Sequence, residues 1–406
     1  MQIFDRLRIL SQREFALFFV ANAMSVFGTT MVPISLSFAL IAAGGSATEI
    51  GGVLASETAP MVLLVAIAGV VGDRWRRDKV IILADLLRFS AQLALFALLF
   101  SGHVYLPIIL LLSALIGVGN AFYGPAAGGI LPQLVAPNQL REANGLLGMA
   151  NSSAFVMGPA LAGIIIGLWG AEWAIAVDAA TYAISAICIA LIRPKARAGS
   201  QPVATSVASE FGAGLREVLQ RRWLTIVIGQ FALLNLIATP SFLVLGPIIY
   251  ATTTNGAASW GFIASSSGVG GVLGGLAVLY WRASNPLLAI ELAILVFVIP
   301  LSLLALNVPA TTMLIGGGVL GAAGVIVNAL LGTMIQREVP QGSLSRVYSI
   351  MGAISAGVAP LGYALVGPLS EHFGSANVLW FAAVAVGVIV LAVIVAGDVR
   401  KFQESQ

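Results

Sequence analysis

Long apolar stretches recur along the whole chain and are separated by short polar connections. Each stretch is long enough for an α-helix to cross the hydrocarbon core of a bilayer, which takes about 20 residues. Hydropathy predicts about twelve spans. They lie near 15–42, 48–72, 80–101, 105–130, 142–168, 172–192, 223–250, 258–281, 286–307, 310–335, 344–368 and 376–397.

Composition excludes a water-soluble protein. Charged residues make up 9% of the 406 positions, against about 25% in soluble domains. Hydrophobic residues reach 59% and the mean hydropathy is +1.00. We therefore expect a polytopic helical membrane protein. The high isoelectric point, about 9.2, fits the positive-inside bias of such proteins, and no basic stripe with aromatic residues indicates nucleic-acid binding.

The basic residues predict an orientation. If both termini are cytoplasmic, the 20 Lys and Arg residues fall on or beside the inward segments. The outward connections, such as 43–48, 101–105 and 251–257, carry none. This distribution follows the positive-inside rule. It supports an even number of spans in the cell membrane, with both ends inside the cell.

One long connection divides the predicted spans into two equal sets. It runs from Arg193 to Arg222, begins with Pro194, Lys195 and Arg197, passes through a Gly/Ser/Ala/Pro stretch and ends in a short amphipathic segment. We read it as a linker followed by a helix on the inner membrane surface. The expected fold is all-α, with two pseudo-symmetric six-helix bundles at 1–192 and 223–406, joined by a cytoplasmic linker at 193–222.

The two sets also echo one another in sequence, at three places in the same order. The matched pairs are 120–124 (NAFYG) with 328–332 (NALLG), 133–137 with 336–340, and 158–159 with 359–360. This order indicates a parallel duplication. Transporters use duplicated halves, with the substrate near the middle of the membrane between them.

A charged hairpin joins the second and third predicted spans, within 69–88. The hairpin resembles the loop between helices 2 and 3 of the major facilitator superfamily. The residues that match this loop are Gly69, Asp73, Arg74, Arg77 and Lys79. Arg76 replaces a usual glycine and Asp78 a usual base. The ending ADLLR at 84–88 resembles one branch, the macrolide-efflux and enterobactin-exporter-like transporters.

The resemblance implies the twelve-helix fold and a gate, in which Asp73 meets the start of the eleventh span near 343–348. A carboxylate at a helix N-terminus gains about 0.3–1 kcal/mol. The alternative is a solvated turn that only sets the topology; it explains the arginines but not the Gly69/Asp73 spacing.

The fifth span carries small residues on one face. This face resembles the antiporter motif of drug exporters. Its residues are Gly145, Gly158, Pro159 and Gly163, with Ala154 and Ala162. The resemblance implies packing against the eighth span, which has glycines at 268, 270, 271, 274 and 275. Ordinary close packing of helices explains the spacing equally well.

Carboxylates inside a membrane are costly, so those in the spans are candidates for proton coupling. They are Glu57, Asp85, Asp178 and Glu291. The three-residue spacing of Asp85 and Arg88 favours a structural ion pair. Asp178 and Glu291 lie on spans that are usually peripheral in this fold, where a buried hydrogen-bonded role or a place at the lipid edge is equally plausible. Glu57 ranks first as the proton carrier.

The cavity is expected between spans 1, 4, 7 and 10. Their polar and aromatic residues are Asn22, Ser25, Asn120, Phe122, Tyr123, Asn235, Thr239, Phe242 and Asn328. Such a lining without fixed charge suits amphiphilic compounds better than sugars or phosphates. The asparagines alternatively bridge neighbouring helices.

These observations predict a proton-driven exporter of hydrophobic or amphiphilic compounds, a drug-efflux antiporter of the kind that gives multidrug resistance. An exporter of a defined metabolite such as a siderophore or a lipid is the alternative, and a non-transporting receptor is a further one. The spans contain no constellation typical of an enzyme, because the only histidines, His103 and His372, lie at outer loops. We expect no cofactor, no metal and no nucleic-acid partner. The expected partners are the substrate, protons and the bilayer around a monomer.

Overall fold

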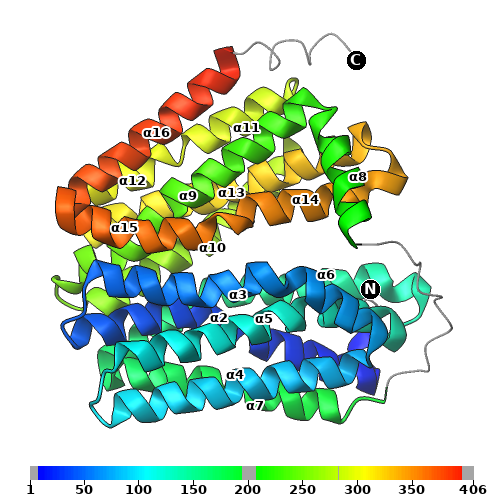
Figure 1. Ribbon diagram of the computed structural model, residues 1–406, viewed down its shortest axis with the longest axis horizontal. Coiled ribbons are helices and arrows are strands. Elements are labelled where there is room, and N and C mark those ends of the chain that lie inside the picture. The colour runs from blue at the N-terminus through cyan, green and yellow to red at the C-terminus, as the bar shows by residue number, and fades with distance from the viewer. Residues whose placement is uncertain (1–7, 194–206, 282, 396–406) are drawn as a thin grey trace. The chain divides into compact units, whose positions relative to one another are not determined.

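The computed structural model describes residues 8–193, 207–281 and 283–395, and it is helical with no strand in these segments. Figure 1 shows the helices. The first part comprises α2 (Arg13–Ala42), α3 (Ala47–Arg74), α4 (Arg77–Phe100), α5 (Leu106–Leu134), α6 (Leu140–Trp169) and α7 (Ala171–Ala190), with the short η1 (Arg8–Ser11) and η2 (Pro137–Gln139). The second comprises α8 (Val207–Leu219), α9 (Arg222–Ala251), α10 (Gly256–Tyr280), α11 (Pro286–Leu295), α12 (Val298–Ala305), α13 (Ala310–Glu338), η3 (Gln341–Ser343), α14 (Leu344–Gly357), α15 (Ala359–Phe373) and α16 (Ser375–Val395).

The predicted spans are present. Within the described residues, eleven helical segments are long and apolar enough to cross a membrane, when α11 with α12 and α14 with α15 each count as one. Helix α3, with 28 residues, is a further long helix. The all-α fold with twelve membrane helices is therefore confirmed.

Two spans that the sequence predicts as continuous are divided. The chain leaves the α-helix at 296–297 and again at Val358. A proline follows each break, Pro300 and Pro360, and neither has the backbone N–H that would bind the carbonyl four residues earlier. At the first break, Ile299 N bonds the carbonyl of Val296 instead, over 3.0 Å.

Contacts divide the chain into two compact units. The first contains Met1–Ala43 and Ser56–Ala204, and the second contains Gly44–Ala55 and Thr205–Gln406. The beginning of α3 thus belongs to the second unit, where Glu371 accepts a hydrogen bond from Thr48 N over 3.0 Å. Each unit is described separately below.

The helices pair in the same order inside each unit. In the first, α2 packs on α7 and α6, and α4 packs on α7 and α5. In the second, α9 packs on α16 and α15, and α11 and α12 pack on α16 and α13. Figure 1 shows α12 beside α16. Counted by span, these are equivalent pairs, as a parallel duplication requires.

Glycines let α10 and α13 approach closely in the second unit. A Cβ atom at Gly270 would overlap the backbone of Gly318, and one at Gly321 would overlap the backbone of Ser267. Small residues of this kind let two membrane helices come into backbone contact. Gly270 of the eighth span and Gly321 of the tenth therefore serve packing inside their own unit.

The amphipathic segment of the long connection forms α8, which packs on α14 and α9. Gly214 and Val218 face this contact, while Phe211 and Leu219 are exposed. The exposed apolar side chains on a short helix are typical of a helix at a membrane surface. Most of the linker before α8 lies outside the described residues.

Candidate functional site

A buried cation forms the centre of the first unit. Arg88 on α4 is 2% exposed and forms an ion pair with Asp85, one turn earlier on the same helix. This pair confirms the prediction from their spacing. The guanidinium carbon of Arg88 lies 4.3 Å from the ring centroids of both Tyr123 and Tyr182. Two aromatic rings at this distance stabilise a desolvated cation.

Two glycines of α5 leave the space that this arrangement needs. A Cβ atom at Gly119 would overlap the side chain of Arg88, and one at Gly117 would overlap the carbonyl oxygen of Glu57 on α3. Asn120, which follows Gly119 on α5, bridges α4 and α3. Its Oδ1 accepts from Arg88 Nη1 over 3.2 Å, and its Nδ2 donates to Glu57 Oε1 over 3.3 Å.

Carboxyl groups outnumber cations in this buried region. Ser185 donates to Asp85 over 2.7 Å. A second carboxyl, Asp178 on α7, is fully buried and accepts from Gln92. Asp85 pairs with Arg88 directly and Glu57 reaches it through Asn120, while Asp178 bonds Gln92 and Thr181 instead. One guanidinium balances one carboxylate, so two groups remain that can bind protons in a poorly solvated place.

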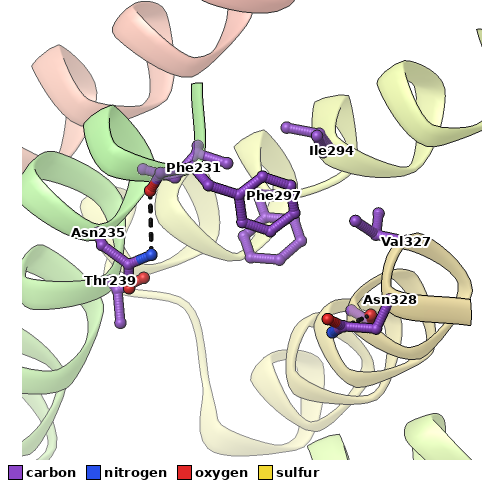
Figure 2. Close-up of a pocket in the computed structure, with 9 residues that line it drawn as sticks. Phe231, Asn235, Thr239, Ile294, Phe297, Val327 and Asn328 are labelled. Atoms are coloured by element: carbon purple, nitrogen blue, oxygen red, sulfur yellow. Dashed lines mark hydrogen bonds between the residues drawn. The ribbon is translucent and has the colours of Figure 1, made fainter. Parts of the chain in front are cut away.

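A pocket opens in the second unit, with about 420 Å³ of empty space that is partly open to solvent. It lies between α9, α11 and α13 (Figure 2). Its lining consists of Phe231, Leu234, Asn235, Thr239, Ile294, Phe297, Gly324, Val327 and Asn328. None of the described residues that line it is charged. Three of the predicted substrate-binding residues, Asn235, Thr239 and Asn328, meet here.

The two asparagines face the pocket from opposite helices (Figure 2). Asn235 donates to the carbonyl of Phe231 over 3.0 Å, and Asn328 donates to that of Gly324 over 2.8 Å. Each amide uses one N–H on its own helix, so its oxygen and second N–H can bind a ligand. The pocket therefore combines apolar walls with two polar anchors.

The fourth predicted carboxyl, Glu291, lies outside the pocket lining. It is fully buried on α11 and accepts a hydrogen bond from Gln230 on α9 over 2.8 Å. Asp178 and Glu291 are thus both buried and hydrogen-bonded. A place at the lipid edge is excluded for both.

The other predicted cavity residues have partners inside the protein. Asn22 donates to Asn151 over 2.8 Å and Ser25 is buried. Phe242 is buried against Trp260, with ring centroids 5.1 Å apart. Phe122 packs on the core of the first unit, beside Tyr123. A direct role of these residues with substrate stays a prediction.

The hairpin between α3 and α4 is only partly described. The side chains of Asp73 and Arg74 lie outside the described residues, so their gate role stays a prediction. Arg77 donates to the carbonyl of Gly129 on α5, while Lys79 is exposed. Arg76 pairs with Asp78 over 2.8 Å, and this hydrogen bond and charge raise the pKa of Arg76. A side chain added at Gly69 would meet no atom of the described residues.

The small-residue face of α6 packs on α2. A Cβ atom at Gly158 would overlap Thr30, whose hydroxyl donates to the carbonyl of Ala154 over 3.1 Å. Pro159 and Gly163 are buried, whereas Gly145 is exposed with open space around it. The motif thus serves close packing inside the first unit, and its contact with the eighth span stays a prediction.

Sequence reasoning missed several residues of both sites. Phe297 reaches the pocket from the helix break, and a search for a proline three residues after an aromatic in a span would have found it. Phe231 lies on α9 one helical turn before the predicted Asn235. Tyr182 carries no sequence signal for a cation partner, because Arg88 lies on another helix.

A family profile described as transmembrane secretion effector matches residues 6–406. The multidrug efflux pump Tap of Mycolicibacterium fortuitum is 25% identical over 359 residues, which cover 86% of this chain and 87% of that protein. Macrolide efflux protein A of Streptococcus pyogenes is 24% identical over 402 residues, covering 96% and 97%.

Solved structures show the same fold. The crystal structure of the nucleoside transporter NupG superposes with a TM-score of 0.78 at 14% identity, over 95% of this chain and 99% of that one. A transporter of the POT family, in complex with 5-aminolevulinic acid, gives 0.73 at 12% identity, over 97% of both chains. At this level of identity the likeness concerns the fold alone.

Proposed function

The chain belongs to the transmembrane secretion effector family of the major facilitator superfamily, and on this basis we propose that it exports hydrophobic or amphiphilic small molecules, drugs among them. Proteins of this fold carry substrate by exposing a site near the middle of the membrane to each side in turn. Two similar proteins of nearly the same length are named for the efflux of drugs and of macrolides. The chain acts as a transporter and performs no chemical reaction on its substrate.

One observation carries the substrate class, namely the uncharged pocket of the second unit. Phe231 and Phe297 offer flat apolar surfaces, and Asn235 and Asn328 offer hydrogen bonds that orient a ligand. Sugars and phosphates need many polar or charged partners, which this lining does not supply. An amphiphilic compound buries its apolar body here and satisfies the two amides.

The membrane and the orientation are inferred from the distribution of basic residues. We place the protein in the cell membrane, with both termini and the 193–222 segment in the cytoplasm, because every Lys and Arg falls on or beside the segments that this orientation puts inside. We expect a monomer surrounded by lipid. A reporter inserted in the 193–222 segment and read from the outside would contradict this orientation.

Expression in a bacterial host without its own efflux pumps is expected to lower the intracellular amount of amphiphilic drugs. A panel of drugs and siderophores, with and without a protonophore, measures this effect. Phe297→Ala is expected to weaken apparent affinity about threefold to tenfold, because the missing ring removes part of the 1.5–3 kcal/mol that burial of a phenylalanine contributes.

Phe262→Ala is the matched control, because Phe262 is 47% exposed on α10 and does not line the pocket. It should leave the resistance profile of the wild type unchanged. Drug accumulation that is the same with and without expression, over the whole panel, would remove the proposed substrate class.

We propose that protons drive export and that Glu57 carries one of them. Glu57 is half-buried and reaches Arg88 only through Asn120. It can therefore gain and lose a proton while Asp85 keeps the guanidinium paired. Glu57→Gln is expected to abolish drug uptake into everted vesicles that is driven by a pH gradient, while folded protein remains in the membrane.

Glu142→Gln, at an exposed carboxyl of α6, serves as the control and should transport as the wild type does. If the Glu57→Gln variant still concentrates drug in response to the gradient, another group performs the coupling.

A further inference from the structure

Two of the buried polar atoms in the second unit that lack a hydrogen-bond partner belong to one pair of side chains, Gln230 and Glu291. Gln230 Nε2 donates to Glu291 Oε2 over 2.8 Å. The other oxygen of each group, Gln230 Oε1 and Glu291 Oε1, is buried without a partner. Gln230 is 2% exposed and Glu291 is 0% exposed. Buried polar atoms in proteins almost always have a hydrogen-bond partner, so these two unpaired oxygen atoms need an explanation.

A single proton explains both atoms. An ionised carboxylate and an amide oxygen are acceptors only, whereas a protonated carboxyl is also a donor. A proton on Glu291 Oε1 can be donated to Gln230 Oε1, while Gln230 Nε2 continues to donate to Glu291 Oε2. The two planar groups then form a ring closed by two hydrogen bonds, and every polar atom of the pair is satisfied.

No cation competes with this arrangement among the described residues. Helix α11 contacts α13 and α16, and the hydrogen bond adds α9. The ionisable side chains on these helices are Arg222 and Tyr250 on α9, and Arg337 and Glu338 on α13, while α16 has none. Arg222 lies eight residues before Gln230, about 12 Å along the helix axis. Tyr250 lies at the far end of α9, and Arg337 and Glu338 are exposed at the end of α13.

The pair lies next to the pocket. Glu291 precedes the lining residue Ile294 by three positions on α11, and Gln230 precedes Leu234 by four on α9. Residues at these spacings lie on the same helix face, so the pair is one helical turn before the pocket on both helices.

We propose that Glu291 and Gln230 form a proton-binding site at the end of this pocket, in which the carboxyl holds an exchangeable proton shared with the amide oxygen. The site is separate from Glu57, which lies in the other unit. Its role in coupling rests on the proposed export function, but its protonation does not. An ion gradient can therefore act on the pocket through a residue that substrate does not need to touch.

Infrared spectroscopy of the purified full-length protein tests this site without any substrate. The wild type is expected to show a carbonyl stretch of a protonated carboxyl at neutral pH that shifts in D₂O and loses intensity as the pH rises. Glu291→Gln should remove this contribution while the amide keeps the hydrogen bond. Gln230→Leu should retain it at a changed frequency, because the carboxyl loses its amide partner.

Glu338→Gln, at an exposed carboxyl, is the matched control and should leave the spectrum of the protonated carboxyls unchanged. The proposal is overturned if Glu291→Gln removes no protonated-carboxyl signal, which is the result expected for an ionised Glu291 that binds water. It is also overturned if the signal does not shift in D₂O and does not change with pH. If Glu291→Gln does not fold, the shift caused by Gln230→Leu decides. A protein that exports nothing would refute the function above and leave this result intact.

Discussion

Replacing Arg88 with leucine is expected to lower the free energy of unfolding by about 3–5 kcal/mol, because the change leaves a buried carboxylate without its cation. Asp85 is 0% exposed and its cation is Arg88. The rings of Tyr123 and Tyr182 also lose the guanidinium that lies between them. The thermal unfolding midpoint of detergent-purified protein, followed by size-exclusion chromatography with fluorescence detection, measures this loss.

A double variant separates the missing charge from the missing volume. Asp85→Leu combined with Arg88→Leu removes both charges, and replacing a whole buried ion pair by apolar groups is often neutral or even stabilising. We expect the double variant to recover a large part of the stability that Arg88→Leu loses. Equal instability of the two variants would show that the unpaired carboxyl is not the cause.

Arg76→Leu is the matched control, since Arg76 is also an ion-paired arginine but its side chain is 65% exposed. Water solvates both members of that pair, so its loss should change stability little.

Gly321→Ala is expected to cost about 1–3 kcal/mol of stability and to reduce export, because the new methyl group overlaps the backbone of α10. The atoms it meets are the backbone carbon and oxygen atoms of Ser267, which cannot rotate away as a side chain would. The two helices must therefore separate, and α13 also carries the pocket residues Val327 and Asn328. Unfolding midpoint and drug accumulation are measured on the same variant.

Gly318→Ala provides the control on the same helix. Its added Cβ meets only the carbonyl oxygen of Ser266, at 3.7 Å, which is ordinary contact. Because alanine favours the helix over glycine by up to about 1 kcal/mol, this variant should be as stable as the wild type or more stable. A similar loss at both positions would mean that close approach of α10 and α13 is not what the glycines provide.

The repeated asparagines show how far the sequence reaches. Their matched positions, 120 and 328, follow from the duplication, and the equivalent helices pair alike in the two units. Their surroundings differ. Asn120 is held between Arg88 and Glu57, while Asn328 lines an uncharged pocket. The repeat predicts the position of each asparagine, but side chains from other helices decide its role.

The same limit applies to the carboxyl groups. The spacing of Asp85 and Arg88 predicts their ion pair, because three residues along a helix fix the distance between side chains. The contact between Gln230 and Glu291 joins residues 61 positions apart. No periodicity in one sequence indicates that contact.

By itself, the sequence determined the class of the protein, its spans, the duplication and the charged hairpin. Hydropathy and local spacing act over one or two helical turns, and a bilayer leaves few alternatives to helices for such segments. Only the tertiary structure decided that Asn120 links Glu57 to Arg88, which prolines divide a span, and where the pocket opens. These features depend on side chains from separate helices, and their meeting is set by packing across the whole unit.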